Sequence, residues 1–310
     1  GNKAFENVKF LSVDVPNTVT SIGTNAFKGT INVNYTGSAT GSPWGALTRN
    51  SYVEGDLVYT DSTKTTITKC NQSATNVTIP NSVTTISNTA FQSCTGLTSI
   101  TIPDSVTSIG ESVFKSCTGL TSVTIGSGIT TISGSAFQSC TGLTSITIPS
   151  TVTTINGSAF KSCTGLTSIT IPDSVTSVGS QAFMDCRGLT SITLGTGITT
   201  TPSYMFANCT GLTSVTIPSG ITGIDQYAFS GCSGLTSVTI PNTVTSIGAS
   251  AFSGSTNLYT VTVPDTVTTI GSSAFNGVTI LYYNGTATGS PWGAKCVNGY
   301  VEGDFIYSDN

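Results

Sequence analysis

The clearest hydrophobic pattern in this chain is a short alternation that ends at a proline. In "TSITIP" at residues 98–103, Ile100 and Ile102 alternate with Ser99 and Thr101 before Pro103. A period of two is typical of a strand that buries one face. Pro103 removes a backbone donor, and the Pro-Asp pair favours the opening of a type I turn. The pattern therefore predicts a strand of three or four residues followed by a reversal of the chain.

Two further elements are predicted after this turn. In "VTSI" at 106–109, Val106 and Ile109 point inward, which predicts a weaker strand on the opposite side of the unit. The segment "ESVFKSC" at 111–117 then predicts about one helical turn that buries Phe114 and Cys117. One unit therefore contains two short strands and one helical turn.

This unit recurs with a fixed period of 23 residues. Phe stands at 91, 114, 137, 160, 183, 206, 229, 252 and 275, and Cys and Leu follow the same rule from 94 and 97. Such a period predicts a solenoid, in which each unit is stabilised chiefly by the units stacked beside it. The predicted structural core includes Phe91, Cys94, Leu97, Phe114, Cys117, Leu120, Phe137, Cys140, Leu143, Phe160, Cys163 and Leu166.

The full pattern L-x-x-I-x-I-P-x-x-V-x-x-I-G-x-x-A-F-x-x-C resembles the treponemal, or BspA-like, class of leucine-rich repeat. It covers residues 8–29 and 75–280. The resemblance implies a right-handed, curved superhelix with a parallel β-sheet on its concave face. Together with the repeat, it predicts a β-rich α/β solenoid of 23-residue coils, with short strands and single helical turns on the other sides.

A second, longer repeat relates the two ends of the chain. Residues 27–61 recur at 275–309, so "GSPWGA" occurs at 41–46 and at 289–294. We interpret residues 1–48 as the end of a preceding array and 49–74 as a β-hairpin junction that turns near residues 61–64. Residues 75–282 form the main array, and 283–310 close it and begin the next junction. The whole reads as one continuous solenoid excised from a longer protein.

Composition removes several classes of function. The chain has no His, which excludes Ser-His-Asp, Cys-His and His-based metal catalysis. A net charge of −4, with only ten basic residues, argues against nucleic acid or an anionic membrane as partner. No apolar run approaches the roughly 20 residues that span a bilayer. We therefore expect neither an enzyme nor membrane insertion of this fragment.

The nine cysteines invite a metal or disulfide interpretation. Metal sites favour local clusters such as C-x-x-C, which the sequence lacks, so no metal or other cofactor is predicted. Stacked coils place neighbouring Cys residues about 4.8 Å apart, and parallel side chains keep their Cβ atoms farther apart than the ~3.8 Å of a disulfide. The cysteines of the repeat are therefore predicted to be free, buried thiols.

The candidate ligand-binding surface is the concave face, where each first strand exposes one Ser and one Thr. Its residues are Ser99, Thr101, Ser122, Thr124, Ser145, Thr147, Ser168, Thr170, Ser191, Thr193, Ser214, Thr216, Ser237, Thr239, Thr260 and Thr262. These hydroxyl rows vary little, and β-propensity with solubility explains them equally well.

A second candidate is an aromatic cluster between the arrays. Trp44, Tyr52, Tyr59 and Trp292 could form an exposed anchor of the kind enriched in binding hot spots. Alternatively, the two tryptophans fill the interrupted core. One unit also departs from the repeat pattern. Thr201 replaces the buried Ile, Pro202 replaces the turn Gly and Met205 replaces the Ala. These changes predict a local loosening of the coil.

Three functions remain open at this point. The resemblance implies a secreted or cell-surface protein that adheres to host extracellular-matrix or plasma proteins, such as fibronectin and fibrinogen, or to other cells. The alternatives are a structural spacer that projects other domains and a repeat surface that binds carbohydrate. Adhesion is the function that we predict.

Overall fold

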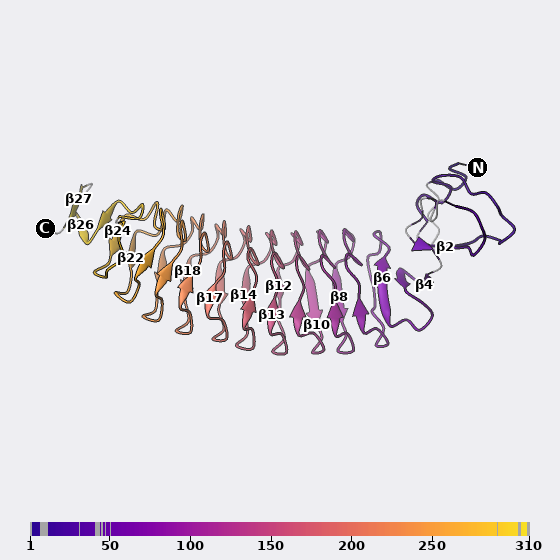
Figure 1. Ribbon diagram of the computed structural model, residues 1–310, viewed down its shortest axis with the longest axis horizontal. Coiled ribbons are helices and arrows are strands. Elements are labelled where there is room, and N and C mark those ends of the chain that lie inside the picture. Colours follow the sequence, from indigo (N-terminus) through magenta and orange to yellow (C-terminus); the bar gives the residue numbers. More distant parts are fainter. Residues whose placement is uncertain are drawn as a thin grey trace.

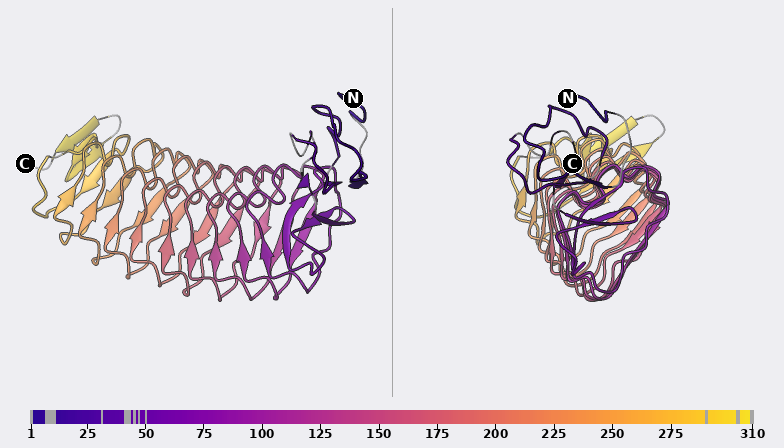
Figure 2. Two further views of the ribbon diagram at one scale, coloured as in Figure 1. Left: turned by 45° about the vertical axis from the view of Figure 1, so that its right-hand side comes forward. Right: turned by 90° about the vertical axis from the view of Figure 1, so that its right-hand side faces the viewer.

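A computed structural model describes residues 2–6, 12–30, 32–40, 44, 46, 48–49, 51–289, 291–302 and 305–308. The coils stack along the long axis into a gently curved body (Figure 1), and they superimpose end-on in a roughly triangular outline (Figure 2). The predicted solenoid is therefore confirmed. The start of the first predicted unit, at residues 8–11, and parts of both "GSPWGA" segments and of "YVEGDFIY" lie outside the described residues.

The first side of the coils carries the predicted "SITI" strands. They pair in parallel with a register of one repeat, so that Ser122 lies between Ser99 and Ser145. The ladders run β8-β10-β12, β14-β16, β18-β20 and β22-β24-β25. The strands are β8 (Ser99–Ile102), β10 (Ser122–Ile125), β12 (Ser145–Ile146), β14 (Ser168–Thr170), β16 (Ser191–Thr193), β18 (Ser214–Thr216), β20 (Ser237–Thr239), β22 (Thr260–Thr262), β24 (Ile280–Tyr282) and β25 (Cys296–Val297).

The second side carries two-residue strands, as the weaker "VTSI" pattern predicts. Parallel ladders run β7-β9, β11-β13-β15 and β17-β19-β21-β23. The strands are β7 (Thr85–Ile86), β9 (Ser108–Ile109), β11 (Thr131–Ile132), β13 (Thr154–Ile155), β15 (Ser177–Val178), β17 (Thr200–Thr201), β19 (Gly223–Ile224), β21 (Ser246–Ile247) and β23 (Thr269–Ile270).

The third side, which we call the turn face, corrects the prediction of single helical turns. Residues 111–116 and their equivalents are consecutive turns, and the described part of the chain contains no helix. Ser112 and Ser116 have left-handed φ angles of 55° and 62°, which an α-helix excludes. The reason is tertiary, because alternate N–H groups leave the coil: the Phe114 N–H donates to the Ala136 carbonyl of the next coil at 2.8 Å.

The interrupted ladder on the second side locates the predicted loosening at the irregular unit. In the preceding coil, the Gly179 N–H donates to the Ile155 carbonyl at 2.7 Å. Pro202 occupies the equivalent position and has no N–H to give. β15 and β17 are not paired, although β17 pairs in register with β19; the ladder is also interrupted between β9 and β11, where no proline stands. The hydroxyl of Thr201 is buried there without a hydrogen-bond partner.

The predicted hairpin junction is also present. It contains β4 (Tyr52–Glu54), β5 (Leu57–Tyr59) and β6 (Thr66–Cys70). β5 pairs antiparallel with both β4 and β6, and β6 also pairs in parallel with β7. The hairpin therefore covers the first coil of the array while continuing its sheet. At the other end, β26 (Gly299–Glu302) and β27 (Phe305–Ser308) form an antiparallel pair.

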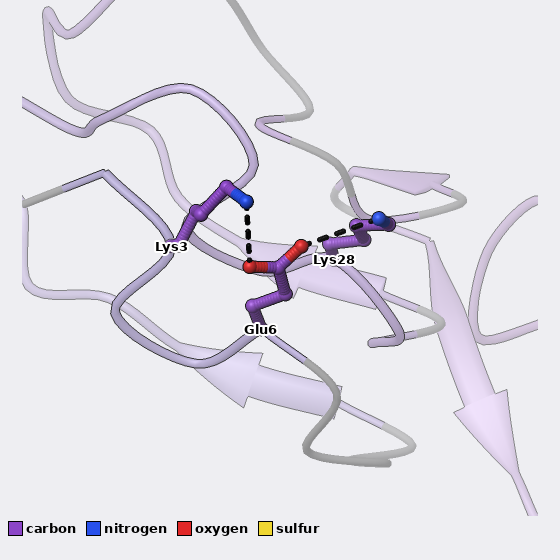
Figure 3. A network of polar contacts seen from close by, with 3 residues as sticks. All are labelled: Lys3, Glu6 and Lys28. Carbon is purple, nitrogen blue, oxygen red and sulfur yellow. Dashed lines mark hydrogen bonds and ion pairs between the residues drawn. The ribbon is translucent and has the colours of Figure 1, made fainter.

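The N-terminal coils lie at one end of the array and have a core of their own (Figure 1). Their parallel sheet contains β1 (Ser12–Asp14), β2 (Asn32–Asn34) and β3 (Thr48–Arg49). Glu6 joins two coils, because its carboxylate pairs with Lys3 at 3.1 Å and with Lys28 at 3.2 Å (Figure 3). The domain boundaries proposed above remain a prediction.

The predicted core columns fill the space between the three sides. Every one of the twelve assigned Phe, Cys and Leu residues between 91 and 166 is fully buried. The phenylalanines form one continuous stack, with 5.0–5.6 Å between the ring centroids of successive coils. Each core side chain therefore packs on the same residue type in the next coil, which explains why neighbouring units have nearly the same sequence.

Candidate functional site

The structure brings the predicted Ser and Thr residues of the first strands into two straight rows, which we call the Ser/Thr face. All sixteen side chains, from Ser99 to Thr262, are exposed. None of their hydroxyls forms a hydrogen bond to another described residue. These groups can therefore exchange water for the polar groups of a partner.

The hydroxyls of a neighbouring row of threonines hydrogen bond to the backbone instead. The Thr121 hydroxyl donates to the Thr98 carbonyl at 3.0 Å, and the same bond recurs in five further coils at up to 3.4 Å. A matching row on the second side starts with Thr107, whose hydroxyl donates to the Thr84 carbonyl at 3.4 Å. The side chains thus reinforce the backbone ladders of the first and second sides.

The Ser/Thr face is hollowed where its ladder is interrupted between β12 and β14. A depression of about 310 Å³ lies there, lined mainly by Ser145, Thr147, Ser168 and Thr170. A similar depression of about 320 Å³ lies beside Ser99, at the start of the array. The face therefore offers shallow, hydroxyl-lined hollows rather than a deep pocket.

The repeat cysteines form a thiol-to-carbonyl ladder inside the coils. The Cys163 thiol donates to the Phe137 carbonyl at 3.1 Å, and five other thiols make the equivalent bond at 3.0–3.2 Å. Ser255 occupies the Cys position in its coil, and its hydroxyl donates to the Phe229 carbonyl at 3.2 Å. Cys and Ser thus supply the same buried donor at this position.

Burial also suppresses the reactivity of these thiols. It raises the pKa of Cys140, Cys186 and Cys232 to about 12. Because the thiolate is the reactive form, little of it exists near neutral pH. The cysteines of the repeat column, from Cys94 to Cys232, are buried free thiols in the structure, as predicted.

The structure contradicts the predicted aromatic anchor for three of its four members. Trp44, Tyr59 and Trp292 are at most 5% exposed, and only Tyr52 reaches the surface. Trp292 packs edge-on against Tyr283 with ring centroids 5.5 Å apart. The alternative interpretation, in which the tryptophans fill the interrupted core, matches their burial.

The same closing unit is built at both ends of the long repeat. The Tyr283 hydroxyl donates to the Val267 carbonyl at 2.5 Å and accepts from the Ala287 N–H at 2.8 Å. Tyr35 makes the equivalent contacts to Val19 and Ala39. These bonds satisfy the buried hydroxyl of each tyrosine. The sequence similarity between residues 27–61 and 275–309 therefore corresponds to a shared structure.

Ionisable groups do not converge on any reactive centre in the described part of the chain. No group of three or more Cys, Asp or Glu residues there has the geometry to hold a metal ion. Within the same residues, no helix exists that could cross a bilayer. The surface chemistry available to the Ser/Thr face is hydrogen bonding.

Sequence reasoning missed one feature, a stacked tyrosine pair on the turn face. Tyr204 and Tyr227 are 23 residues apart, and their rings lie 4.6 Å apart at an interplanar angle of 8°. Their equal place in successive repeats was the available signal. For the irregular unit that contains Tyr204, the sequence predicted local loosening and no surface feature.

Comparison with known proteins agrees with this architecture. The family model described as "BspA type Leucine rich repeat region" matches six copies, over residues 1–38, 65–187 and 153–282. None of the curated proteins matches the chain.

Solved structures of leucine-rich repeat proteins are similar to this chain. One from Bacteroides ovatus is 27% identical, with a TM-score of 0.66, over 80% of this chain and 68% of that protein. One from Eubacterium ventriosum is 23% identical, with a TM-score of 0.56, over 91% of this chain and 85% of that protein. The second of these likenesses concerns the fold alone.

Proposed function

Because the chain belongs to the BspA-type leucine-rich repeat family, we propose that it is a non-enzymatic interaction protein of the cell surface. In this proposal it adheres to an extracellular-matrix or plasma protein of a host, or to another cell. Repeat surfaces of this family generally mediate protein binding. We propose both the class of partner and the location at the cell surface.

One observation carries the proposal, the two rows of unpartnered hydroxyls on the Ser/Thr face. Eight strands, from β8 to β22, contribute to the rows. At the spacing of neighbouring strands, they extend over roughly 34 Å. A standard protein interface buries about 800 Å² on each partner, and a face of this length provides the extent that such an interface needs.

The ladders beside the Ser/Thr face support the same proposal. They hold the strands in a fixed register, so a partner meets a surface that is already ordered. Binding to an ordered surface avoids much of the entropy cost of association. The same stiffness would suit a structural spacer, and the experiment below separates these two functions.

The test is binding of the chain to immobilised fibronectin, fibrinogen, laminin and collagen at physiological salt. The variant Thr147→Arg/Thr170→Arg/Thr193→Arg places three bulky cations on the Ser/Thr face. We expect the parent chain to bind at least one of these proteins and the variant to lose at least tenfold in affinity.

A matched control carries the same three charges on another side. Ser108, Ser177 and Ser246 are exposed on the second side, so Ser108→Arg/Ser177→Arg/Ser246→Arg should bind like the parent. Equal loss in both variants would indicate a charge effect and reject the Ser/Thr face. Failure of the parent to bind any of the four proteins would reject adhesion to them and favour the spacer. Labelling of intact cells with an antibody against the array tests the proposed location.

A further inference from the structure

The turn face carries an outward column that repeats in every coil with a left-handed backbone. The φ angles of this column lie between 55° and 62°. We call it the turn column, and its members are Ser112, Ser135, Ser158, Gln181, Tyr204, Tyr227, Ser250 and Ser273. Serine fills it from Ser112 on except at Gln181, Tyr204 and Tyr227, and Thr89 holds the equivalent place in the first coil of the array.

A second outward column changes in the same part of the array. Ser93, Ser116, Ser139 and Ser162 give way to Asp185 and Asn208, again with left-handed φ angles. Arg187 follows two residues later, where other coils have Thr or Ser. We call Gln181, Asp185, Arg187, Tyr204, Asn208 and Tyr227 the Tyr patch. In this part of the array both columns depart from serine.

Contacts within the Tyr patch hold its side chains in place. The rings of Tyr204 and Tyr227 stack at 4.6 Å, which fixes both orientations. The Asn208 amide donates to the Asp185 carboxylate at 3.0 Å. Hydrogen bonds between neighbouring coils, such as that from the Tyr204 N–H to the Gln226 carbonyl at 3.1 Å, fix the backbone beneath. The patch is therefore ordered before any partner arrives.

The residue types of the Tyr patch differ from those of the Ser/Thr face in what they can contribute to binding. Tyr and Arg are enriched among the few residues that dominate protein interfaces, whereas Ser and Thr are under-represented. Tyrosine offers a large, rigid contact area at a low cost in side-chain entropy. Both phenol hydroxyls remain without a hydrogen bond to any described residue, and the Arg187 side chain is 65% exposed.

Charge indicates the chemistry of the partner. Arg187 and Asp185 carry opposite charges 3.9 Å apart, so the six residues of the Tyr patch have no net charge. The only charged group bonded to its edge is the Lys161 ammonium, which donates to the Gln181 side chain at 2.9 Å among the described residues. Recognition by such a patch relies on packing and on neutral hydrogen bonds, which salt screens weakly. A protein surface with a neutral, apolar hollow and acceptors for two phenol hydroxyls fits this description.

We propose that the Tyr patch is a hot spot for the protein partner of the array, with the surrounding serines of the turn face as a weakly contributing rim. This inference rests on the proposed adhesion function. It adds a specificity-determining contact at residues 181–227 of the turn face to the contact that the Ser/Thr face makes.

The test replaces both tyrosines by the residue that the other coils carry. Tyr204→Ser/Tyr227→Ser should keep the fold, checked by circular dichroism, and lower the affinity for the matrix or plasma protein that the parent binds by about 30-fold or more. The matched control Tyr52→Ser/Tyr259→Ser removes two exposed tyrosines outside the turn face. It should stay within twofold of the parent.

Each of the remaining outcomes tests whether the Tyr patch is a hot spot. Parent-like binding by Tyr204→Ser/Tyr227→Ser overturns the hot spot and leaves adhesion standing. Absence of binding by the parent overturns both proposals. Affinity that falls more than tenfold between 50 and 500 mM salt contradicts a neutral patch. Binding of the parent to a glycan array, with loss in the same variant and no protein partner, reassigns the patch to carbohydrate and overturns this inference.

Discussion

The phenylalanine stack provides a quantitative test of the idea that each coil is stabilised by its neighbours. Phe160 lies in the middle of the stack, 5.4 Å from the ring of Phe137 and 5.3 Å from that of Phe183. Truncation of a buried Phe to Ala costs about 3–5 kcal/mol. Each aromatic pair adds about 0.5–1.5 kcal/mol. We therefore expect Phe160→Ala to lower the free energy of unfolding by about 4–8 kcal/mol.

Phe91 is the matched comparison, because it stands at the start of the same stack. It is equally buried but has one phenylalanine neighbour, Phe114, at 5.0 Å. Phe91→Ala should therefore cost about 1 kcal/mol less than Phe160→Ala, the contribution of one aromatic pair. Phe160→Leu, which keeps most of the volume, should cost less than either.

The assay is urea-induced unfolding, monitored by far-UV circular dichroism for the whole array and by fluorescence. Trp292 lies at the C-terminal end of the array core and is buried, so its emission should report that end. A central truncation weakens the coupling between the two halves, and the two probes should then separate, since repeat arrays lose cooperativity at a weak interface. Equal costs for Phe160→Ala and Phe91→Ala, or a cost below about 2 kcal/mol for the first, would refute stacking as the main source of stability.

Three other substitutions or conditions test the hydrogen bonds of the core. Cys163→Ser should cost less than Cys163→Ala in thermal unfolding, by about 1 kcal/mol, because serine keeps the donor to the Phe137 carbonyl. Thr201→Val should raise the free energy of unfolding by about 1–2 kcal/mol, since it removes a buried hydroxyl without a partner; a loss of stability would contradict the assignment. Alkaline titration should destabilise the protein between pH 9 and about 12, because the Cys140 thiol stays protonated in the fold while the unfolded thiol ionises above pH 9. The free energy of unfolding should fall by about 1.4 kcal/mol per pH unit for each such thiol. A free energy of unfolding that does not change with pH in the parent, as in a variant with Cys140 replaced by Ser, would contradict this prediction.

The sequence was sufficient for the strands and the core because these features follow from local alternation and from the fixed period. Ile100 and Ile102 alternate with polar residues, and the structure buries both in β8. The same reasoning failed on the turn face. Whether residues 111–117 form a helix depends on where alternate N–H groups find acceptors, and the Phe114 N–H finds one in the next coil. That choice is tertiary and leaves no periodic signature.

The tryptophans show a second limit of sequence reasoning. A short segment such as "GSPWGA" has no strand or helix period that would tell an exposed anchor from a core residue. The burial of Trp292 depends on its packing against Tyr283, whose hydroxyl is held by a distant carbonyl. Residue type alone therefore left a surface role and a core role open, and the fold decides for the core.

The three sides of a coil differ in how freely their residues can change, and this difference bears on where function arises. The Cys column holds only small buried residues, Ser255 with the same donor and Val278 at the closing coil included. The irregular unit shows the cost of a change in the ladder, because Pro202 coincides with an interruption of the second side. In contrast, the turn column accommodates Ser, Gln and Tyr in successive coils at nearly the same φ angle. Its side chains point outward from a backbone that hydrogen bonds to neighbouring coils already fix, so a binding surface can change there without a change in the stack.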